Sequence, residues 1–571
     1  MPQNHRRVAF SGKKKKAQLA ERKQKKTTHA NPFLLNKTLK DDASDSEKKG
    51  EGLEVQKLNY QPGPDGRLNR YVFHFYRESE KQLREAREVA RLPLEHVPRE
   101  ALETGDDFFV GYNFPQRPPW NFEMSKQKLE WNENKYFRDY MQNLEKLHYD
   151  EKKILSYCEL NLETWRQLWR VLEISDMFLL IADIRFPTLM FPPSLYHHIR
   201  GELGKSMILV LNKIDLVAPE VVLAWKKYFQ ERYPALHILT FTSFPSYNLR
   251  GPQGSSTGIL IRRRRGKMRM AAEGAHEVYK AVNDIVGTAL DISSWERKIL
   301  EELNVSDGDD EEEEMETPDV HEEEKDLDFQ KYVPHKNGIL TIGCLGFPNV
   351  GKSSLMNALM GRKVVSVSRT PGHTKHFQTI FLTENVRLCD CPGLVFPSSA
   401  PRSLQVLMGS YPIAQLREPY AAIRFLCERI DLLSLLGLKH EYYDPEEGWS
   451  PIIVCDEWAV KRGFLTARVA RPATYRSANH ILRMALDGKF SLHLLPPDFI
   501  KNEAAWLDHP ELKDIIAIQS KDPKLSEISF VNFTDSEDEN EESSDGEGDE
   551  KDPSCIPTTN AFAALLKADE C

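Results

Sequence analysis

The sequence predicts an α/β fold with a doubly wound, mostly parallel sheet. Apolar runs typical of buried strands occupy 177–187, 206–215 and 237–244, and segments of helical period separate them. The same alternation resumes at 339–360, where an apolar strand leads through a glycine-containing loop into a helix. Strands that alternate with helices in this way are typical of parallel sheets covered on both faces. A further strand is expected at 386–394.

Composition predicts a soluble globular protein with charged, disordered segments. Of the 571 residues, 40% are apolar and 29% are charged, which suits about two to four domains. The N-terminal arm is rich in Lys and Arg, whereas 306–328 and 534–551 are strongly acidic. Like charges repel one another and bury little apolar surface, so we expect these three segments to be disordered. No apolar run of ~18 residues or targeting segment is visible, so we expect neither membrane insertion nor secretion.

Eight cysteines are scattered along the chain without the paired spacing of a zinc site. We therefore expect them to be small buried hydrophobic residues in a reducing compartment. Composition and periodicity together predict five regions. They are a basic disordered arm (1–75), a helical lead-in (76–150), an α/β domain (151–400) with a disordered insert at about 245–335 that holds one helix near 271–290, a helical C-terminal module (401–500) and an acidic disordered tail (501–571).

One loop carries the pattern of a phosphate-binding site. The stretch GFPNVGKSS at 346–354 fits G-x-x-x-x-G-K-[ST], with an apolar strand before it and a helix after it, as the motif requires. The glycines let backbone N–H groups close around phosphate oxygens at the helix N-terminus. Lys352 is predicted to lie against the β- and γ-phosphates, and the Ser353 hydroxyl to ligate Mg²⁺.

Two further motifs fit the metal and the γ-phosphate. DCPG at 390–393 follows an apolar strand, so Asp390 is placed to hold the hydration shell of Mg²⁺ and Gly393 to offer a backbone N–H to the γ-phosphate. D-x-x-G alone is usually a turn, but its position after a phosphate loop favours the metal interpretation. Between the two motifs, TPGHTKHFQT offers Thr374 as the second hydroxyl on the metal.

A third motif, NKID at 212–215, ends an apolar strand and has the pattern of a guanine reader. The Asp215 carboxylate is predicted to accept hydrogen bonds from guanine N1–H and the 2-amino group, neither of which adenine presents. A site built for those bonds rejects analogues because its own polar groups would be left unpaired. Asn212 is expected to contact the base and the Lys213 stem to pack on its face. Ser243, at the end of the next strand, is expected to offer a backbone contact to guanine O6.

These elements occur in an unusual order. The guanine reader comes first along the chain, and the phosphate loop and D-x-x-G follow, whereas the reverse is usual in GTP-binding proteins. A doubly wound domain tolerates circular permutation because its termini lie close together. The sequence therefore predicts a circularly permuted P-loop GTPase domain.

In this order the motifs resemble the circularly permuted GTPases of the YlqF/YawG type, and among them the large nuclear, nucleolar and cytoplasmic eukaryotic members. The resemblance covers roughly 150–500. Two departures are DIR at 183–185, where the family has DAR, and a long insert between Ser243 and Gly346. The resemblance rests on the stretches NLETWRQLWRVLEISDMFLLIADIRFP, LNKIDL, GFPNVGKSSLMNAL, TPGHTKHFQT and DCPGLVFP. In addition, YRSANHILRMALDGKFSLHLLPP is similar to the C-terminal helical module of the family.

The resemblance implies GTP and GDP as ligands, with Mg²⁺, and a role in ribosome assembly or maturation. Ser353, Thr374 and Asp390 are the expected metal ligands, and Asn349, Lys352, Thr374 and Gly393 the expected catalytic residues. The expected nucleotide contacts are Asn212, Lys213, Asp215, Ser243, Asn349, Val350, Gly351, Lys352, Ser353, Ser354, Asp390 and Gly393.

The position after D-x-x-G is Leu394, where many GTPases carry a Gln that orients the attacking water. We therefore expect slow intrinsic hydrolysis. In related GTPases an Asn at the position of Asn349 is linked with a K⁺ ion near the phosphates; a loop-shaping role for this Asn is the alternative. The principal interpretation is a slow GTP hydrolase that acts as a switch. A nucleotide-gated binding module with negligible hydrolysis is the alternative, and an ATP-using enzyme is disfavoured because adenine offers Asp215 no partner.

Partners and location follow from charge and resemblance. The Lys-rich arm, or the run Arg262–Arg265, is predicted to contact RNA through phosphates, with a ribosomal precursor particle or rRNA as the target. A solubilising tail is the alternative for the arm. We expect nuclear or nucleolar and cytoplasmic residence with shuttling. The acidic segments are candidates for phosphorylation at Ser306, Ser543 or Ser544, with unmodified solvated tails as the alternative. Sequence alone predicts no oligomeric state.

Overall fold

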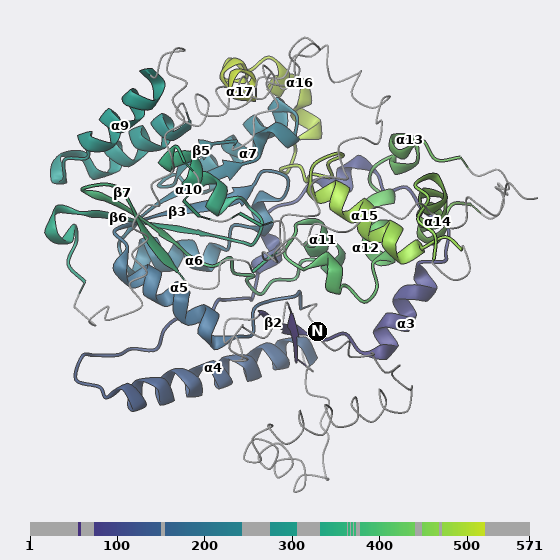
Figure 1. The fold of residues 1–571 in the computed structure, drawn as a ribbon, viewed down its shortest axis with the longest axis horizontal. Coiled ribbons are helices and arrows are strands. Elements are labelled where there is room, and N and C mark those ends of the chain that lie inside the picture. The colour runs from purple at the N-terminus through teal and green to yellow at the C-terminus, as the bar shows by residue number, and fades with distance from the viewer. Residues whose placement is uncertain are drawn as a thin grey trace, which may run out of the picture. The chain divides into compact units, whose positions relative to one another are not determined.

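The core of the protein is a sheet of six strands in the order β5-β4-β3-β6-β8-β7 (Figure 1). Every pairing in it is parallel except that of β7 with β8. This confirms the predicted doubly wound, mostly parallel sheet. The strands are β3 (Met177–Asp183), β4 (Ser206–Asn212), β5 (His237–Thr240), β6 (Leu340–Gly346), β7 (Gln378–Thr383) and β8 (Val386–Asp390).

The computed structural model describes most of the chain between 55 and 519. All described residues belong to one structural unit, Met1–Ser520. The described ranges are 55–58, 73–149, 155–242, 274–304, 332–362, 364–365, 367–368, 371–372, 377–439, 448–466 and 471–519.

Strand β3 joins the two parts of the permuted chain into one sheet. β3 pairs in parallel with β4, its neighbour along the chain, and also with β6, which follows only after the long insert. Asp183 lies opposite Asn212, and Ile181 lies opposite Gly346. The guanine motif and the phosphate motif therefore meet at one edge of the sheet, as the permutation predicts.

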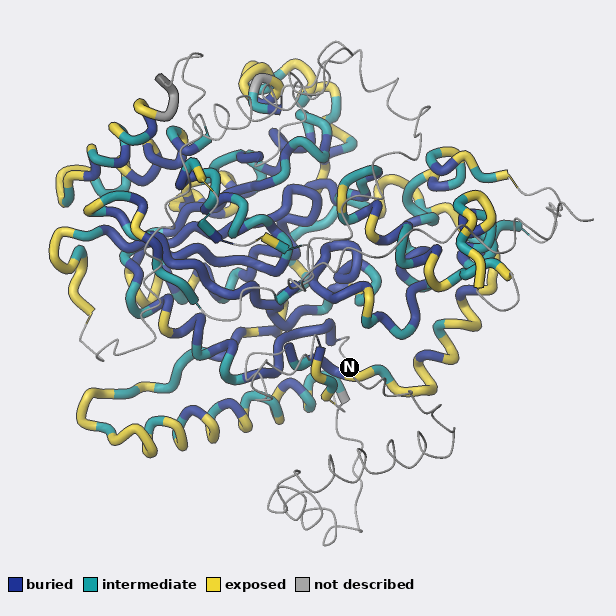
Figure 2. Tube along the Cα trace, in the orientation of Figure 1, coloured by how far each residue is buried: buried dark blue, intermediate teal, exposed yellow. Residues whose placement is uncertain are grey.

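Apolar strands and amphipathic helices make a large main core (Figure 2), beside a smaller cluster around Tyr76 and Leu144. α5 (Leu162–Ile174) begins at Asn161, whose side chain accepts from the Glu163 N–H. It buries Trp165 and Trp169, of which 0% and 2% are exposed. The other helices of this part are α6 (Pro193–His197), α7 (Pro219–Arg232) and α10 (Lys352–Met360).

The predicted basic disordered arm is wrong at its C-terminal end. β1 (Val55–Leu58) and β2 (Phe73–Tyr76) form an antiparallel pair, and Phe73 and Phe75 are buried. Their aromatic rings stabilise the pair by packing into the main core, a long-range effect that the polar flanking sequence did not indicate. The rest of the arm lies outside the described residues.

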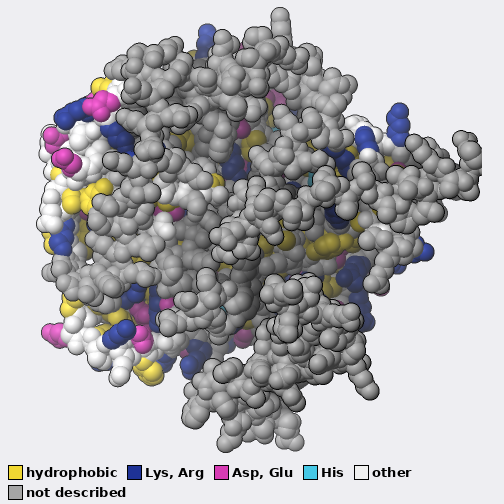
Figure 3. All heavy atoms as spheres, viewed as in Figure 1, with side chains coloured by type: hydrophobic (Ala, Val, Ile, Leu, Met, Phe, Trp, Pro, Cys, Tyr) yellow, Lys and Arg dark blue, Asp and Glu magenta, His cyan; other side chains and the backbone are white. Residues whose placement is uncertain are grey.

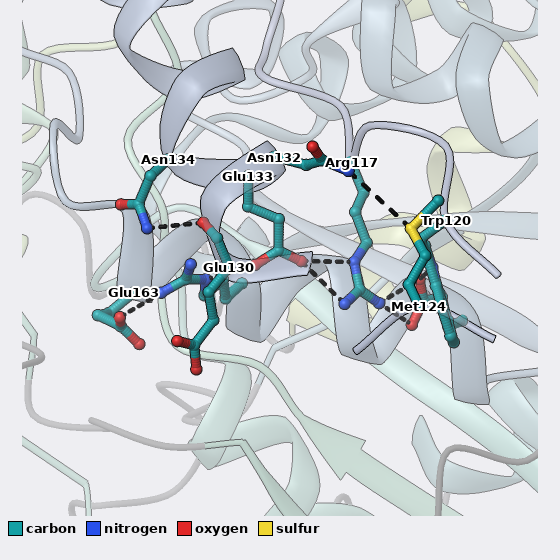
Figure 4. Close-up of polar contacts among 10 residues, drawn as sticks. Arg117, Trp120, Met124, Glu130, Asn132, Glu133, Asn134 and Glu163 are labelled. Atoms are coloured by element: carbon teal, nitrogen blue, oxygen red, sulfur yellow. Dashed lines mark hydrogen bonds and ion pairs between the residues drawn. The ribbon is translucent and has the colours of Figure 1, made fainter. Parts of the chain in front are cut away.

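Helices predicted for 76–150 are present as α3 (Glu80–Val89) and α4 (Lys126–Tyr149). Ser79 caps α3 in a reciprocal capping box with Gln82. α4 is anchored by Glu133, which is 3% exposed and bonds both Arg117 and Arg166. Figure 4 shows the contact with Arg117. A buried carboxylate is tolerated here because two guanidinium groups compensate its negative charge.

The predicted disordered insert is wrong in part. Within 245–335 the structure describes a helix at 274–286 and α9 (Ser293–Asn304), where one helix was expected. Trp295 of α9 is fully buried, and the Ser294 hydroxyl donates to Thr383 Oγ1 at 3.0 Å. Tyr332 also donates its hydroxyl to Asp176 at 2.9 Å. The acidic run of the insert and the cluster Arg262–Arg265 lie outside the described residues.

Residues after D-x-x-G are helical, as predicted for the C-terminal module, but the helices continue into the predicted tail. α16 and α17 pack against α7, so the prediction of disorder is wrong up to Gln519. The helices are α11 (Arg402–Leu407), α12 (Tyr420–Cys427), α13 (Leu432–Leu436), α14 (Pro451–Lys461), α15 (Thr474–Leu486), α16 (Glu503–Leu507) and α17 (Leu512–Gln519).

Most of the described cysteines are buried, as composition predicts. The six described cysteines are free thiols, and five of them are buried. Among the described helices, none has the length and apolar character needed to cross a membrane.

Glu159 is a buried carboxyl beside the segment that follows D-x-x-G. Its Oε1 accepts from the backbone N–H groups of His74 and Asn161 at 3.1 and 2.8 Å, and its own N–H bonds Val395 O. Burial raises the pKa of Glu159 to about 8, and the N–H donors offset part of that rise. The folded state therefore holds a proton that the unfolded state loses at lower pH.

We predict that Glu159→Gln flattens the pH dependence of stability. The folded pKa is raised, so the free energy of unfolding of the native protein falls as pH rises from about 5 through about 8, by at most roughly 1.4 kcal/mol per pH unit. Gln keeps the acceptor oxygen but cannot ionise, so the variant should lose this slope. Urea unfolding at pH 5, 7 and 9 measures it. Parallel slopes in both proteins would contradict the prediction.

Candidate nucleotide-binding site

The predicted site residues that the structure describes come from loops at the carboxyl ends of three strands. The loop after β6 carries the phosphate motif, the loop after β8 carries D-x-x-G, and the loop after β4 carries NKID. The loop after β3 lies between the base and phosphate motifs, because β3 is the strand that separates β4 from β6. Ligands of open α/β sheets bind at this edge.

The phosphate loop has the backbone geometry that its sequence predicts. Gly351 has a φ of +96° immediately before α10 begins at Lys352, and Asn349 has a φ of +58°. The Lys352 ammonium donates to the carbonyls of Gly346 and Phe347 at 3.1 and 2.7 Å. Only 7% of Lys352 is exposed, and burial lowers its pKa. The loop therefore holds the Lys352 ammonium at the N-terminus of α10, and helix N-termini are sites where phosphate oxygens bind.

Asp390 and Ser353 form the described part of the predicted metal site. Asp390 Oδ2 lies 3.5 Å from Ser353 Oγ, while the buried Oδ1 has no hydrogen-bond partner among the described residues. Burial raises the pKa of Asp390 to about 6, although Lys352 lowers it. A carboxylate and a hydroxyl oxygen are ligands that suit Mg²⁺. Thr374, the third predicted ligand, lies outside the described residues.

The D-x-x-G loop closes tightly over the phosphate loop. A Cβ added to Gly393 would lie 2.8 Å from the backbone of Pro348 and 3.0 Å from Lys352 Nζ. Glycine is therefore required for this close approach. Leu394 is 2% exposed and packs in the core, so its side chain fills space rather than facing solvent.

The guanine motif is bonded directly to the phosphate loop. Asn212 Nδ2 donates to Val350 O at 2.7 Å, and Lys213 Nζ donates to Asn349 O at 2.6 Å. Lys213 has a φ of +61° and its N–H bonds Asn212 Oδ1, so the lysine turns back towards the phosphate loop. Two motifs far apart in the chain are thus one structural unit.

The predicted base-reading carboxylate lies on the same loop. Asp215 is half-buried and accepts from the Thr242 hydroxyl at 2.7 Å, which fixes one of its oxygens beside the end of β5. Ser243, the predicted O6 contact, lies outside the described residues. Gln519 of α17 supports this loop from behind, because its amide donates to the carbonyls of Ile214 and Val217.

Asn349 connects the phosphate loop to the helical module. Its Nδ2 donates to Gly409 O at 3.0 Å, beyond the end of α11. Gly409 has a φ of +74°, and a Cβ added there would lie 3.1 Å from Asn349 Nδ2. The role expected for Asn349 from sequence alone did not include this contact.

Sequence reasoning missed three residues that support the predicted site. Asp183 and Arg185 follow β3, and both are almost completely buried, at 0% and 2% exposed. Charged residues at the end of an apolar strand are a visible signal, and DIR was noted only as a departure from the family pattern. Gln519 carried no signal, because a single glutamine at the end of a short helix in the predicted tail has no motif around it.

The chain is similar to several known proteins. The family model described as 50S ribosome-binding GTPase matches residues 341–433. Guanine nucleotide-binding protein-like 1 from Mus musculus is 47% identical over 492 residues, covering 82% of this chain and 80% of the relative. The human protein of the same name is 47% identical over 493 residues with the same coverage.

A solved structure is also similar. GNP-bound YlqF from T. maritima is 15% identical, with a TM-score of 0.32, and the match covers 58% of this chain and 97% of that one. The identity and coverage of the mouse and human relatives decide the family. The chain therefore belongs to the guanine nucleotide-binding protein-like 1 family of GTP-binding proteins.

Proposed function

We propose that this GTP-binding protein hydrolyses GTP slowly to GDP and phosphate and acts as a nucleotide-dependent switch. The observation that carries the proposal is the direct bonding of the guanine motif to the phosphate loop, through Asn212 to Val350 O and Lys213 to Asn349 O. A guanine bound at Asp215 and phosphates bound at Lys352 would then be held by one rigid unit.

The proposed mechanism is electrostatic. Lys352 and the N-terminal N–H groups of α10 are placed to stabilise negative charge on the phosphates. Mg²⁺, held by Ser353 and Asp390, would supply further charge neutralisation when bound. Gly393 would offer its N–H to the γ-phosphate, as its close packing on Pro348 supports. Leu394 cannot orient a water molecule, so turnover is expected to be slow.

K⁺ dependence is the part of the mechanism that Asn349 would carry. We expect single-turnover GTP hydrolysis to be at least about tenfold faster in K⁺ than in Na⁺ buffer, because an extra cation near the phosphates replaces a missing transition-state contact. Lys352→Ala is the blank and should show no turnover in either buffer. Equal rates of the native protein in both buffers would contradict a K⁺ role and leave Asn349 as a loop-shaping residue.

The same experiment tests the second candidate function, a binding module with negligible hydrolysis. The buried Leu394 and the contact of Asn349 with Gly409 favour this alternative. GTP that remains intact in both buffers would establish it. In either case ordering of the D-x-x-G loop would reposition the helices after 401, because that loop leads directly into α11.

Hydrogen exchange tests the coupling to the module. We expect amides of α11, α12 and α15 to exchange more slowly with a bound GTP analogue than with GDP. An identical pattern in both forms would contradict nucleotide gating.

The proposed partner is a ribosomal precursor particle or rRNA, contacted by the Lys- and Arg-rich arm. The 50S ribosome-binding description of the matching family supports a ribosomal target. Lys and Arg side chains are also visible where α3 lies (Figure 3), but that helix alternates them with glutamates. The arm itself lies outside the described residues. Nuclear, nucleolar and cytoplasmic residence, and phosphorylation at Ser306, Ser543 or Ser544, are proposed from the sequence.

Neutralising Lys13–Lys16 to Gln tests the RNA contact. We expect co-sedimentation with ribosomal particles to weaken and its salt dependence to become shallower, because fewer phosphate counterions are released. GDP affinity is the control and should not change. Unchanged co-sedimentation at all salt concentrations would exclude the arm as the RNA element.

A further inference from the structure

Asp183 is a fully buried carboxylate that joins two cations. It ends β3, and its Oδ2 lies 2.8 Å from both Arg185 Nη2 and Lys213 Nζ. Its Oδ1 accepts from Arg185 Nε at 3.0 Å and from the Arg185 backbone N–H at 3.1 Å. These cations hold the pKa of Asp183 well below its usual range in spite of burial. Both carboxylate oxygens are therefore fully used inside the protein.

Lys213 is held in one conformation by this carboxylate. An ammonium has three donors, and here one bonds Asp183 Oδ2 and another bonds Asn349 O at 2.6 Å. The backbone of Lys213 is left-handed, with a φ of +61°, and the side chain folds back from the guanine motif onto the phosphate loop. The stem that is expected to pack on guanine therefore depends on Asp183 for its direction.

Arg185 connects the same carboxylate to the helical module. Its Nη1 donates to Ala485 O at 2.9 Å, near the end of α15, and its own carbonyl accepts from the Leu494 N–H at 2.8 Å. Beside this contact, a Cβ added to Gly488 would lie 2.4 Å from Leu216, which follows the NKID motif in the loop after β4 (the guanine loop). The end of α15 thus packs against the guanine loop and is bonded to the pair that supports it.

We infer that Asp183 is a positioning residue for guanine recognition, acting through Lys213, and that Arg185 couples this support to the end of α15. The inference rests on the proposed guanine contacts of Lys213 and Asp215. It adds a second carboxylate to guanine binding, one that touches the base-packing lysine and never the nucleotide. It also gives the helical module a route to the base end of the site, separate from the D-x-x-G loop.

A purely structural ion pair is the competing explanation. Removing one partner from any buried pair destabilises a protein, so loss of stability alone cannot identify a positioning residue. Glu133 provides a matched control, because it is also buried, also binds two cations, Arg117 and Arg166, and lies on α4 (Figure 4). Glu133→Gln should lower stability without changing nucleotide affinity.

A double-mutant cycle on the full-length protein tests the inference. GDP affinity is measured by calorimetry for Asp183→Asn, Lys213→Ala and the double variant, with unfolding followed in parallel. We expect Asp183→Asn to weaken GDP binding about tenfold, roughly 1.4 kcal/mol, in the native background. In the Lys213→Ala background it should weaken binding less than about twofold, because contacting residues are non-additive. If Asp183→Asn does not fold, Asp183→Glu is used in the same cycle.

Arg185→Gln completes the design. It should weaken GDP binding and, in hydrogen exchange, raise the exchange of the C-terminal turn of α15 both with and without GDP. Equal losses from the Asp183 substitution in both Lys213 backgrounds, or an equal loss from Glu133→Gln, would overturn the inference. Failure of the proposed guanine contacts gives a different result from failure of this inference. In that case the native protein would still bind GDP, but substitution of Asp215 would leave its base preference unchanged.

Discussion

Asp215→Asn is expected to reverse the base preference of the protein. Guanine should lose its charged acceptor for N1–H and the 2-amino group, and each such bond contributes roughly 1.5–3 kcal/mol. GDP affinity should therefore fall by about 100-fold to 1000-fold. Xanthine carries a carbonyl in place of the 2-amino group, so an amide that donates to it should bind xanthosine diphosphate more tightly than the native carboxylate does.

Calorimetry with both nucleotides measures this reversal. Asp215 is half-buried and accepts a hydrogen bond from the Thr242 hydroxyl, which an Asn side-chain oxygen can also accept, so the variant should fold. Thermal unfolding without nucleotide is the control. A variant that loses affinity for both nucleotides equally, or keeps its affinity for GDP, would show that Asp215 does not read the base.

Gly351→Ala is expected to disconnect the guanine motif from the phosphate loop. Its φ of +96° disfavours any side chain, and the new Cβ would lie 2.4 Å from Asn212 Nδ2. Asn212 would have to give up its bond to Val350 O. Loss of this bond, together with displaced loop N–H groups, should reduce GDP affinity by about 100-fold, roughly 3 kcal/mol.

Gly204→Ala is the matched control for that substitution. Gly204 also has a positive φ, +63°, but a Cβ there would meet nothing within 4 Å. Both variants should lose about 1–2 kcal/mol of stability from backbone strain, and only Gly351→Ala should lose nucleotide affinity. Chemical denaturation and GDP titration separate the two effects. Similar affinities in the two variants would contradict the proposed link.

Sequence predicted the sheet and its edge well because both are encoded locally. Five of the six strands were predicted from apolar runs, whereas β7, with the sequence QTIFLT, was not predicted. The phosphate and guanine motifs need particular residues at fixed spacing, so their order along the chain was enough to predict that they meet. Folding of the segments around Phe73, Trp295 and Gln519 was not predictable in this way. Their stability comes from packing against parts of the chain that are distant in sequence.

The supporting pair Asp183 and Arg185 was visible but could not be interpreted. A charged residue after an apolar strand is consistent with a ligand contact, a cap or a buried ion pair, and only three-dimensional neighbours decide among these. Lys213, Ala485 and Leu494 come from three separate regions of the chain. No spacing rule connects them, so the coupling to α15 had to come from the structure.

The position of β3 between β4 and β6 has a consequence for synthesis of the chain. The strands β3, β4 and β5, with the guanine loop, leave the ribosome before any phosphate-binding residue exists. Until β6 is made, one edge of β3 presents unpaired N–H and C=O groups, which is the kind of edge that recruits other chains into aggregates. A nascent chain whose synthesis has reached only the insert would thus expose half of a nucleotide site and an unpaired, aggregation-prone strand edge. In the permuted order this exposed edge belongs to β3, beside the guanine motif, whereas in the conventional order it would belong to the phosphate-loop strand β6.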